Sequence, residues 1–385
     1  MARATMFPAA EFAARRDRTR SVMRERGLAA LCVVSPENVY YLLGLDHLGY
    51  FAFTLLVLPL EGEPLLVTRA MERPTVAAQV PGCVHVPFGD DEDPAAAAAR
   101  AVAEVAGRGD RVGVERGSMY LPVAIWDGVR ARLDGLEWAD GSGIVDGVRV
   151  VKSPAEIALV RRAAAISDRA IQAGIAATSA GISEREVAAA VYHELVRGGS
   201  EQPAIAPLIR SRDRLLQEHV TWRDDTLAPG DALFMELSAS VGRYHAPLSR
   251  MIYLDRTPAG TERAASIALD GLETVRAALR PGAVSTDVYA AWQRVVDDGL
   301  GHARYRRHHC GYLVGIGFPP SWVGSGPVGI RDGGDLVIRE GMVFHVLSWL
   351  LGQEPADYVV SDTVLVTADG GELLTGTPHE PVVVR

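Results

Sequence analysis

Short apolar runs alternate with helical segments along the N-terminal part of the chain. Phe12 and Met23 are apolar positions of an arginine-rich segment that predicts an amphipathic helix, and the apolar run after it is typical of a buried strand. Two further apolar runs flank Glu61-Gly62-Glu63, which predicts a β-hairpin, and a run of alanines favours a helix. The expected elements are a helix over 9–26, a strand over 28–34, a hairpin over 53–67, a helix over 95–106 and a strand over 112–114. This alternation predicts an α/β domain that spans residues 1–149.

Helix-capping signals mark the start of a second domain. Ser153 and Glu156 form a capping box, with proline at the first helical position, ahead of apolar residues that recur at the helical repeat. The same signal recurs at Ser183 and Glu186, ahead of a second helix that a pair of glycines ends. We therefore place the domain boundary after residue 149.

Residues 150–385 carry a faint internal repeat. Gly181-Ile182-Ser183 before one helix resembles Ala283-Val284-Ser285 before another, and strand-like sequence punctuated by glycine follows each. This pattern predicts a pseudo-duplicated α+β domain.

Length and charge narrow the class of protein. At 385 residues the chain exceeds the size of most single hydrophobic cores, which agrees with two domains. The formal net charge of −9 argues against a nucleic-acid partner, because binding phosphates requires clustered lysine and arginine. One basic run, residues 304–307, is either a solvated face or a local anion clamp.

Cysteine content and apolar run length bear on location. The three cysteines are too few and too scattered for a disulfide framework or a cysteine-based zinc site. The N-terminus lacks the pattern of a signal peptide, and no apolar run is long enough to span a bilayer. We therefore expect a cytoplasmic protein without membrane partners.

Titratable residues gather around one predicted strand, residues 232–237. Glu236 lies inside this apolar run, where a carboxylate must be paired, hydrogen-bonded or protonated unless it sits on a half-exposed polar face. His219 precedes the strand, and His245 and Arg250 follow it. Histidine is the usual proton carrier near neutral pH, and arginine is a fixed cation suited to a carboxylate. A structural role is the commoner one for any single histidine, so the clustering around Glu236 is what indicates a site.

Residues 308–320 are the most unusual segment of the chain. They begin with His308 and His309 and contain closely spaced glycines, which permit close backbone approach to a ligand. The segment lacks the lysine and hydroxyl residue of a nucleotide loop, and adjacent histidines alone do not form a metal site. A substrate loop and a tight structural turn both fit.

Several motifs resemble the creatinase–prolidase–methionine aminopeptidase family, and the resemblance covers nearly the whole chain. They are residues 148–157, the turn Pro229-Gly230-Asp231, and residues 341–344 and 362–367. The resemblance implies a creatinase-like N-terminal domain of α/β class and a pita-bread C-terminal domain of α+β class with a pseudo-twofold repeat.

Metallopeptidases of this family bind two metal ions through two Asp, one His and two Glu. The resemblance places those ligands at Glu236, Pro247, Tyr312, Leu347 and Ser361. A single carboxylate among such residues cannot hold a pair of divalent ions. We therefore expect neither a metal nor another cofactor.

The remaining pattern resembles the metal-free branch, and ectoine hydrolases most. His219 matches the position of the proton carrier of creatinase, whose substrate-binding glutamates have no match here. Ectoine hydrolases share a Glu-Leu strand motif, an Arg-Tyr-His-x-Pro run and a glycine-rich loop, found here at residues 236–239, 243–247 and 311–322. The segment around Tyr50 resembles the part of the N-terminal domain that reaches a partner's site in that family, which implies a homodimer.

The leading hypothesis is metal-independent hydrolysis of a C–N bond in a small cyclic or amidine-like molecule. His219 and Glu236 are its predicted catalytic residues. The predicted substrate-binding residues are Tyr50, His245, Arg250, His309, Tyr312, His345 and Asp362. The choice between hydrolysis and a related elimination or cyclisation stays open.

Two alternatives remain. One is a metal-dependent Xaa-Pro peptidase with displaced ligands, drawn from His308, His309, His345 and Asp362. The other is a non-catalytic pita-bread binding module, against which the presence of His219 and Glu236 counts.

Overall fold

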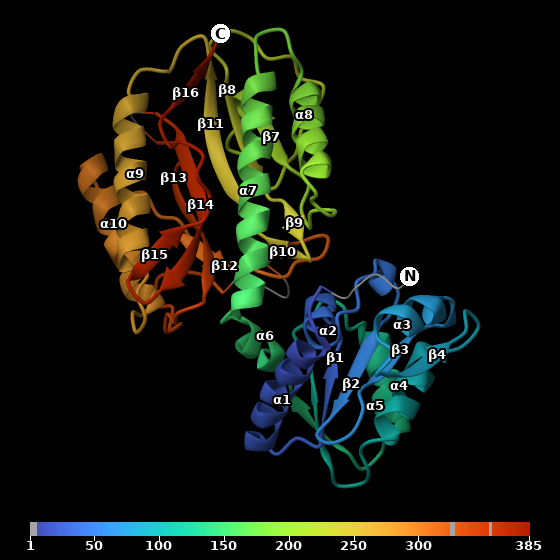
Figure 1. Cartoon of the computed structure of the whole chain (residues 1–385). Helices are drawn as coiled ribbons and strands as arrows, with labels where there is room; N and C mark the ends of the chain where they lie inside the picture. Colours follow the sequence, from blue (N-terminus) through green and yellow to red (C-terminus); the bar gives the residue numbers. More distant parts are fainter. Residues whose placement is uncertain (1–5, 324–327, 354–355) are drawn as a thin grey trace. The chain divides into compact units, whose positions relative to one another are not determined.

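A computed structural model of the chain describes residues 6–323, 328–353 and 356–385. The chain divides into two units, Met1–Arg149 and Val150–Arg385. Figure 1 shows the helices and strands of each unit. In the part of the chain that is described, none of the helices combines the length and the apolar character needed to cross a membrane.

The first unit is built on a six-stranded sheet in the order β4-β3-β2-β1-β5-β6. Its strands are β1 Ala30–Val33, β2 Leu55–Pro59, β3 Leu65–Arg69, β4 Val84–Phe88, β5 Arg111–Val114 and β6 Glu137–Asp140. Its helices are α1 Ala9–Glu25, α2 Pro36–Leu43, α3 Arg73–Gln79, α4 Pro94–Ala103, α5 Val123–Arg132 and α6 Ile144–Arg149, with 3-10 turns at Gly49–Phe51 and Ala70–Glu72. The predicted helices, strands and hairpin are confirmed here, with ends shifted by a few residues.

The second unit is built on an eight-stranded sheet. Its main path runs β12-β13-β14-β11-β8-β7, with β15 on β14 and β16 on β11. The strands are β7 Leu208–Ser211, β8 Ala232–Leu237, β11 Leu248–Leu254, β12 Gly311–Leu313, β13 Val343–Leu350, β14 Tyr358–Thr367, β15 Gly370–Leu373 and β16 Val382–Val384; β9 Ser240–Val241 and β10 Tyr244–His245 form a separate hairpin. The order 12-13-14 beside 11-8-7 is symmetric about the sheet centre, as the internal repeat predicts.

Two helix pairs accompany this sheet, α7 Pro154–Ala177 with α8 Glu184–Arg197 and α9 Thr261–Ala278 with α10 Ser285–Leu300 (Figure 1). The predicted capping box at α7 is present, because Ser153 accepts from the Glu156 amide and the Glu156 carboxylate accepts from the Ser153 amide. Ser183 likewise accepts from the Glu186 amide. The pita-bread fold expected from the resemblance is confirmed.

The helices cover one face of the sheet. The backbone of Gly174 in α7 approaches the side chain of Met235 in β8, and Trp292 in α10 donates to Ser348 in β13 at 3.1 Å. Side chains alternate between faces along a strand. Residues next to Met235 and Ser348, among them Glu236 and Leu347, therefore point to the face opposite the helices.

Candidate active site

A row of four residues crosses the centre of the C-terminal sheet. Glu236 in β8 lies opposite Ser249 in β11, Ser249 opposite Ser361 in β14, and Ser361 opposite Leu347 in β13. Directly opposed residues on neighbouring strands share a face of a sheet. The strand register thus brings together three of the positions assigned to metal ligands by the resemblance, with Ser249 between them.

Glu236 is buried, with 4% of its surface exposed. The alternative of a half-exposed polar face is therefore wrong. Burial raises the pKa of Glu236 to about 8, although the nearby guanidinium groups of Arg210 and Arg307 act in the opposite direction. A carboxyl group with this pKa exchanges its proton near neutral pH.

A chain of hydrogen bonds runs beside Glu236 and is centred on His345. Trp322 donates to the Tyr312 hydroxyl at 3.0 Å, and that hydroxyl lies 2.8 Å from Nδ1 of His345. Nε2 of His345 lies 2.6 Å from the Ser361 hydroxyl, which donates to Ser249 at 2.7 Å. These contacts are satisfied when Tyr312 donates to Nδ1 and Nε2 donates to Ser361.

The imidazole of His345 is neutral in this arrangement. Burial lowers the pKa of His345 to about 3, and burial raises the pKa of Tyr312 well above its usual value. Nδ1 of His345 lies 3.8 Å from Oε1 of Glu236. His345 and Tyr312, both predicted as site residues, therefore form one wall of the site around Glu236.

His245 does not join this group. Its Nδ1 lies 2.9 Å from the Arg243 carbonyl, and its Nε2 accepts from the Ala204 amide at 3.0 Å. Both ring nitrogens thus serve the backbone, and burial lowers the pKa of His245 to about 4. Because both ring nitrogens are engaged, the geometry counts against the predicted substrate-binding role of His245, which stays a prediction.

Arg250 and Asp362 also lie elsewhere. Each follows a residue of the central row, so their side chains point to the other face of the sheet. Arg250 donates to Asp362 at 2.9 Å and to four backbone carbonyls, while Asp362 also accepts from Thr375 and lies 2.8 Å from His379. Burial favours a raised pKa for Asp362, but Arg250 and His379 hold it below the usual value. Because their polar atoms already pair with each other and with the protein, the geometry counts against the predicted substrate-binding roles of both residues, which stay predictions.

His309 adjoins the Tyr312 side of the site. Its ring contacts Tyr312 at 5.3 Å and His308 at 4.1 Å between centroids, and burial lowers the pKa of His309 to about 3. His219 is exposed and lies close enough to His308 to help lower its pKa, after the larger effects of burial and Arg307. The catalytic role of His219 stays a prediction.

Tyr50 belongs to the N-terminal unit. Its ring makes edge contacts with His47 and Tyr120, at 6.4 Å and 5.7 Å between centroids. Its predicted role at a substrate site therefore stays a prediction.

The sequence did not single out Arg210 or Trp349 as candidate site residues. It left open whether Arg307, within the basic run 304–307, is solvated or binds an anion. Arg210 is 1% exposed, and Trp349 is 3% exposed. Arg210 faces Phe234 across the β7–β8 pair, which places it on the same face as Glu236. An arginine flanked by Leu208, Ile209 and a serine in a short strand was the available signal, because such a run buries its charge.

The residues do not fit the metal pair of the metallopeptidases. At the positions assigned to ligands, Pro247 and Leu347 offer no side-chain donor, and Tyr312 and Ser361 are bound to His345. The alternative set is also dispersed, since Asp362 lies on the opposite face of the sheet from His345. Within the described ranges 6–323, 328–353 and 356–385, no three His, Cys, Asp or Glu side chains are arranged to hold a metal ion.

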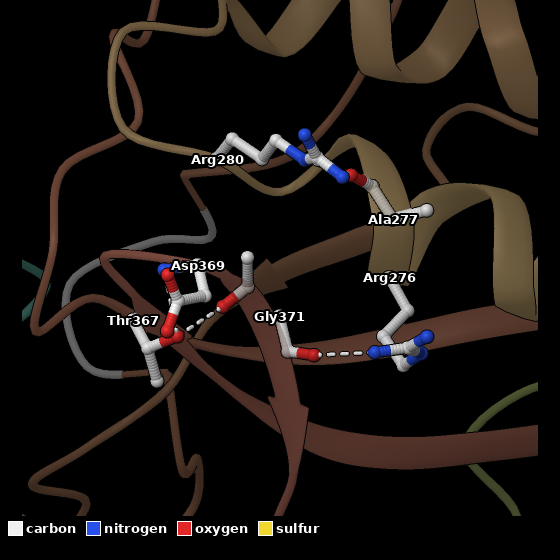
Figure 2. Close-up of a pocket in the computed structure, with 7 residues that line it drawn as sticks. Arg276, Ala277, Arg280, Thr367, Asp369 and Gly371 are labelled. Carbon is white, nitrogen blue, oxygen red and sulfur yellow. Dashed lines mark hydrogen bonds between the residues drawn. The ribbon is translucent and has the colours of Figure 1, made fainter.

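A pocket of about 230 Å³ lies between the end of α9 and the β14–β15 hairpin. Figure 2 shows its lining, with Arg276 donating to the Gly371 carbonyl. Arg276 also binds Glu273, and none of the candidate residues lines this pocket. It is therefore separate from the candidate site.

Two models of known families match the chain. The one described as "Metallopeptidase family M24" matches residues 158–368, and the one described as "Creatinase/Prolidase N-terminal domain" matches residues 15–151.

Relatives with different names are similarly close. An ectoine hydrolase from Halomonas elongata is 27% identical over 395 residues, covering 97% of each chain. A Xaa-Pro dipeptidase from Pyrococcus furiosus is 24% identical over 365 residues, covering 93% of this chain and 96% of its own. The crystal structure of a prolidase from Thermococcus sibiricus superposes with a TM-score of 0.85 at 20% identity, covering 98% of this chain and 100% of the other. The structural likeness shows a shared fold.

Proposed function

Because the chain belongs to metallopeptidase family M24 and is a hydrolase of that family, we propose that it is a metal-independent member that cleaves a C–N bond in a small cyclic or amidine-like molecule. The observation that carries this proposal is Glu236. It keeps a carboxylate at a position that the resemblance assigns to a metal ligand, but burial raises its pKa to about 8. Ser249 lies opposite it in the sheet, and Nδ1 of His345 lies 3.8 Å from its Oε1. Such a group suits proton transfer near neutral pH.

The reaction needs a base for water and an acid for the departing nitrogen. The Glu236 carboxylate takes a proton from water as the water oxygen bonds to the amidinium carbon. It then gives that proton to one of the two nitrogens, whose bond to carbon breaks. The second proton of the water leaves the oxygen as the carbonyl forms and passes to the departing amine, which becomes ammonium. The overall change is an amidinium group plus water to an amide plus an ammonium group, and both stay in one molecule when the broken bond belonged to a ring.

Surrounding groups assist Glu236 in distinct ways. A bound cation favours its ionised form, so substrate binding removes the proton that burial keeps on the free carboxyl group. His345 is held in place from both ring nitrogens and is a positioning residue on the Tyr312 side of Glu236. His219 remains a second candidate proton carrier, on the exposed stretch beside His308.

The test compares Glu236→Gln with Glu372→Gln, because Glu372 is half-exposed and paired with Arg161 away from the site. Ectoine, the substrate named for the Halomonas relative, and other cyclic amidines are the first compounds to assay, by NMR of ring opening. We expect ring opening by the wild type and by Glu372→Gln, and a loss of about 10²-fold or more in Glu236→Gln. A fully active Glu236→Gln enzyme would overturn the proposal.

The alternative with a specific observation behind it is Xaa-Pro dipeptidase activity, which the likeness to the Pyrococcus enzyme favours. Incubation with Xaa-Pro dipeptides and added Mn²⁺ or Co²⁺ tests it. Metal-dependent dipeptide cleavage without amidine hydrolysis would replace the first proposal with this one.

We also propose that the enzyme acts as a homodimer, on the resemblance of the segment around Tyr50 to one that reaches a partner's site. Mixing Tyr50→Ala with Glu236→Gln tests this, because a mixed dimer contains one site with both native residues. If the mixture is more active than the two variants measured separately, Tyr50 of one subunit completes the site of the other. If the activity of the mixture is only the sum of the two separate activities, the proposal is contradicted.

A further inference from the structure

Buried N–H donors without an acceptor lie on the same sheet face as Glu236. Arg210 donates from Nε to the Leu215 carbonyl at 3.1 Å, but among the described residues neither of its Nη atoms meets an acceptor. Nε of Arg307 and Nε1 of Trp349 are also buried and have no acceptor among the described residues. Leaving such donors unpaired costs free energy, and an arginine must keep its charge as well.

Two aromatic rings hold these donors in one cluster. The guanidinium carbon of Arg210 lies 3.9 Å from the centroid of the Phe234 ring, and that of Arg307 lies 4.6 Å from the Trp349 ring. Phe234 and Trp349 meet edge to face at 5.3 Å between centroids. Ring contacts stabilise the two cations, but the Nη atoms of Arg210 and Nε of Arg307 still lack an acceptor among the described residues.

The cluster adjoins the proposed catalytic carboxyl group. Leu208 lies opposite Glu236, and Arg210 lies opposite Phe234, so Arg210 is a diagonal neighbour of Glu236 on the same face of the sheet, with backbone positions roughly 7–8 Å apart. Both arginines act to lower the pKa of Glu236, although no donor of Arg210 is bonded to it.

We propose that Arg210, Arg307 and Trp349 bind a carboxylate of the substrate, and that the substrate is a zwitterion with its amidine carbon beside Glu236. This inference rests on the proposed function. The two free Nη atoms of Arg210 match the two oxygens of a carboxylate, which also supplies acceptors for the other unpaired donors. Arg307 is partly engaged by Glu218 at 3.4 Å, so Arg210 provides the main contact.

The first experiment uses a cyclic amidine with a ring carboxylate and the methyl ester of the same compound. We expect the wild type to favour the acid by at least about tenfold in kcat/KM, since a charged hydrogen-bonded contact is lost in the ester. Arg210→Met keeps an apolar chain over Phe234 and should remove this preference. Arg210→Lys keeps the charge and should retain part of it.

Arg212→Met is the matched control, because Arg212 is exposed and paired with Asp231. It should keep the wild-type preference for the acid. An unchanged acid-to-ester ratio in folded Arg210→Met would overturn the assignment, even if its overall activity falls.

A second experiment does not depend on turnover. Acetate should raise the thermal midpoint of the wild type and of Arg212→Met but not of Arg210→Met, since a ligand of the native state alone stabilises it. Inorganic phosphate distinguishes a planar carboxylate site from a general anion site, and stabilisation by phosphate alone would overturn the carboxylate assignment. Stabilisation by acetate with no amidine hydrolysis would contradict the proposed reaction while the anion site stands. Amidine hydrolysis with no effect of acetate and no preference for the acid would contradict the anion site alone.

Discussion

Nδ1 of His345 lies 3.8 Å from Oε1 of Glu236. Burial keeps the histidine neutral, and burial raises the pKa of the carboxyl group to about 8. The pair therefore has one member that exchanges a proton near neutral pH. Because Glu236 must be ionised to accept a proton from water, kcat/KM should rise with pH and level off above about pH 8. A pH profile of kcat/KM on a cyclic amidine checks this, and a plateau that already begins near pH 5 contradicts it.

The raised pKa of Glu236 should also make the free energy of unfolding decrease as the pH rises. The pKa of Glu236 is raised from 4.5 to about 8 on folding, so its contribution is fully present below pH 4.5 and is lost as pH rises through about 8. Glutamine does not ionise, so Glu236→Gln does not lose this contribution as the pH rises. Relative to the wild type, the variant should therefore gain roughly 2–5 kcal/mol between pH 5 and pH 9.

Unfolding midpoints of both proteins at pH 5, 7 and 9 provide the measurement. Glu37 and Glu115 also have raised pKa values, of about 7, and they are present in both proteins. The difference between the two proteins thus isolates Glu236. A difference that is constant across the pH range would rule out the raised pKa.

The hydrogen bonds of His345 should matter for rate more than for binding. His345→Ala removes the links to Tyr312 and Ser361, and the resulting misplacement of the site should lower kcat on the order of 10²-fold. Tyr312→Phe, which breaks the Nδ1 contact alone, should have a smaller effect. Steady-state kinetics distinguishes the outcomes, and a rise in KM with unchanged kcat would indicate a substrate contact instead of a positioning role.

Arg250 should contribute to stability and not to substrate choice. Arg250→Met leaves the Asp362 carboxylate buried without its guanidinium partner, which should destabilise the fold by about 3–5 kcal/mol. Chemical unfolding measures this loss. The acid-to-ester preference of any folded fraction should match that of the wild type, in contrast to Arg210→Met.

Metal removal should leave activity unchanged. The central row of Glu236, Ser249, Ser361 and Leu347 supplies a single carboxylate, too few hard ligands for a divalent pair. Dialysis against a chelator followed by assay on a cyclic amidine tests this. Loss of activity that Mn²⁺ or Co²⁺ restores would favour the metallopeptidase alternative.

The sequence by itself determined the local elements and the two-unit organisation. The capping box at Ser153 and Glu156 and the apolar run of β8 are local signals, and each is satisfied within a few residues of chain. The pseudo-repeat was also visible, because a similar turn precedes the second helix of each pair, α8 and α10. Glu236 could be identified from the sequence for a related reason. A carboxylate inside an apolar strand is unfavourable unless it is paired, hydrogen-bonded or protonated, and the sequence alone shows this.

Only the tertiary structure decided which polar residues share the site with Glu236. Arg250 follows Ser249 by one residue, and that single step sends its side chain to the other face of the sheet, where Asp362 pairs with it. In the sequence His245 is as suitable a site residue as His345. In the structure both of its ring nitrogens contact backbone atoms, of Ala204 and Arg243. The pairing of β7 with β8 places Arg210 on the same face of the sheet as Glu236. Strand register and long-range hydrogen bonds fix these outcomes, and neither can be read from the spacing of residues along the chain.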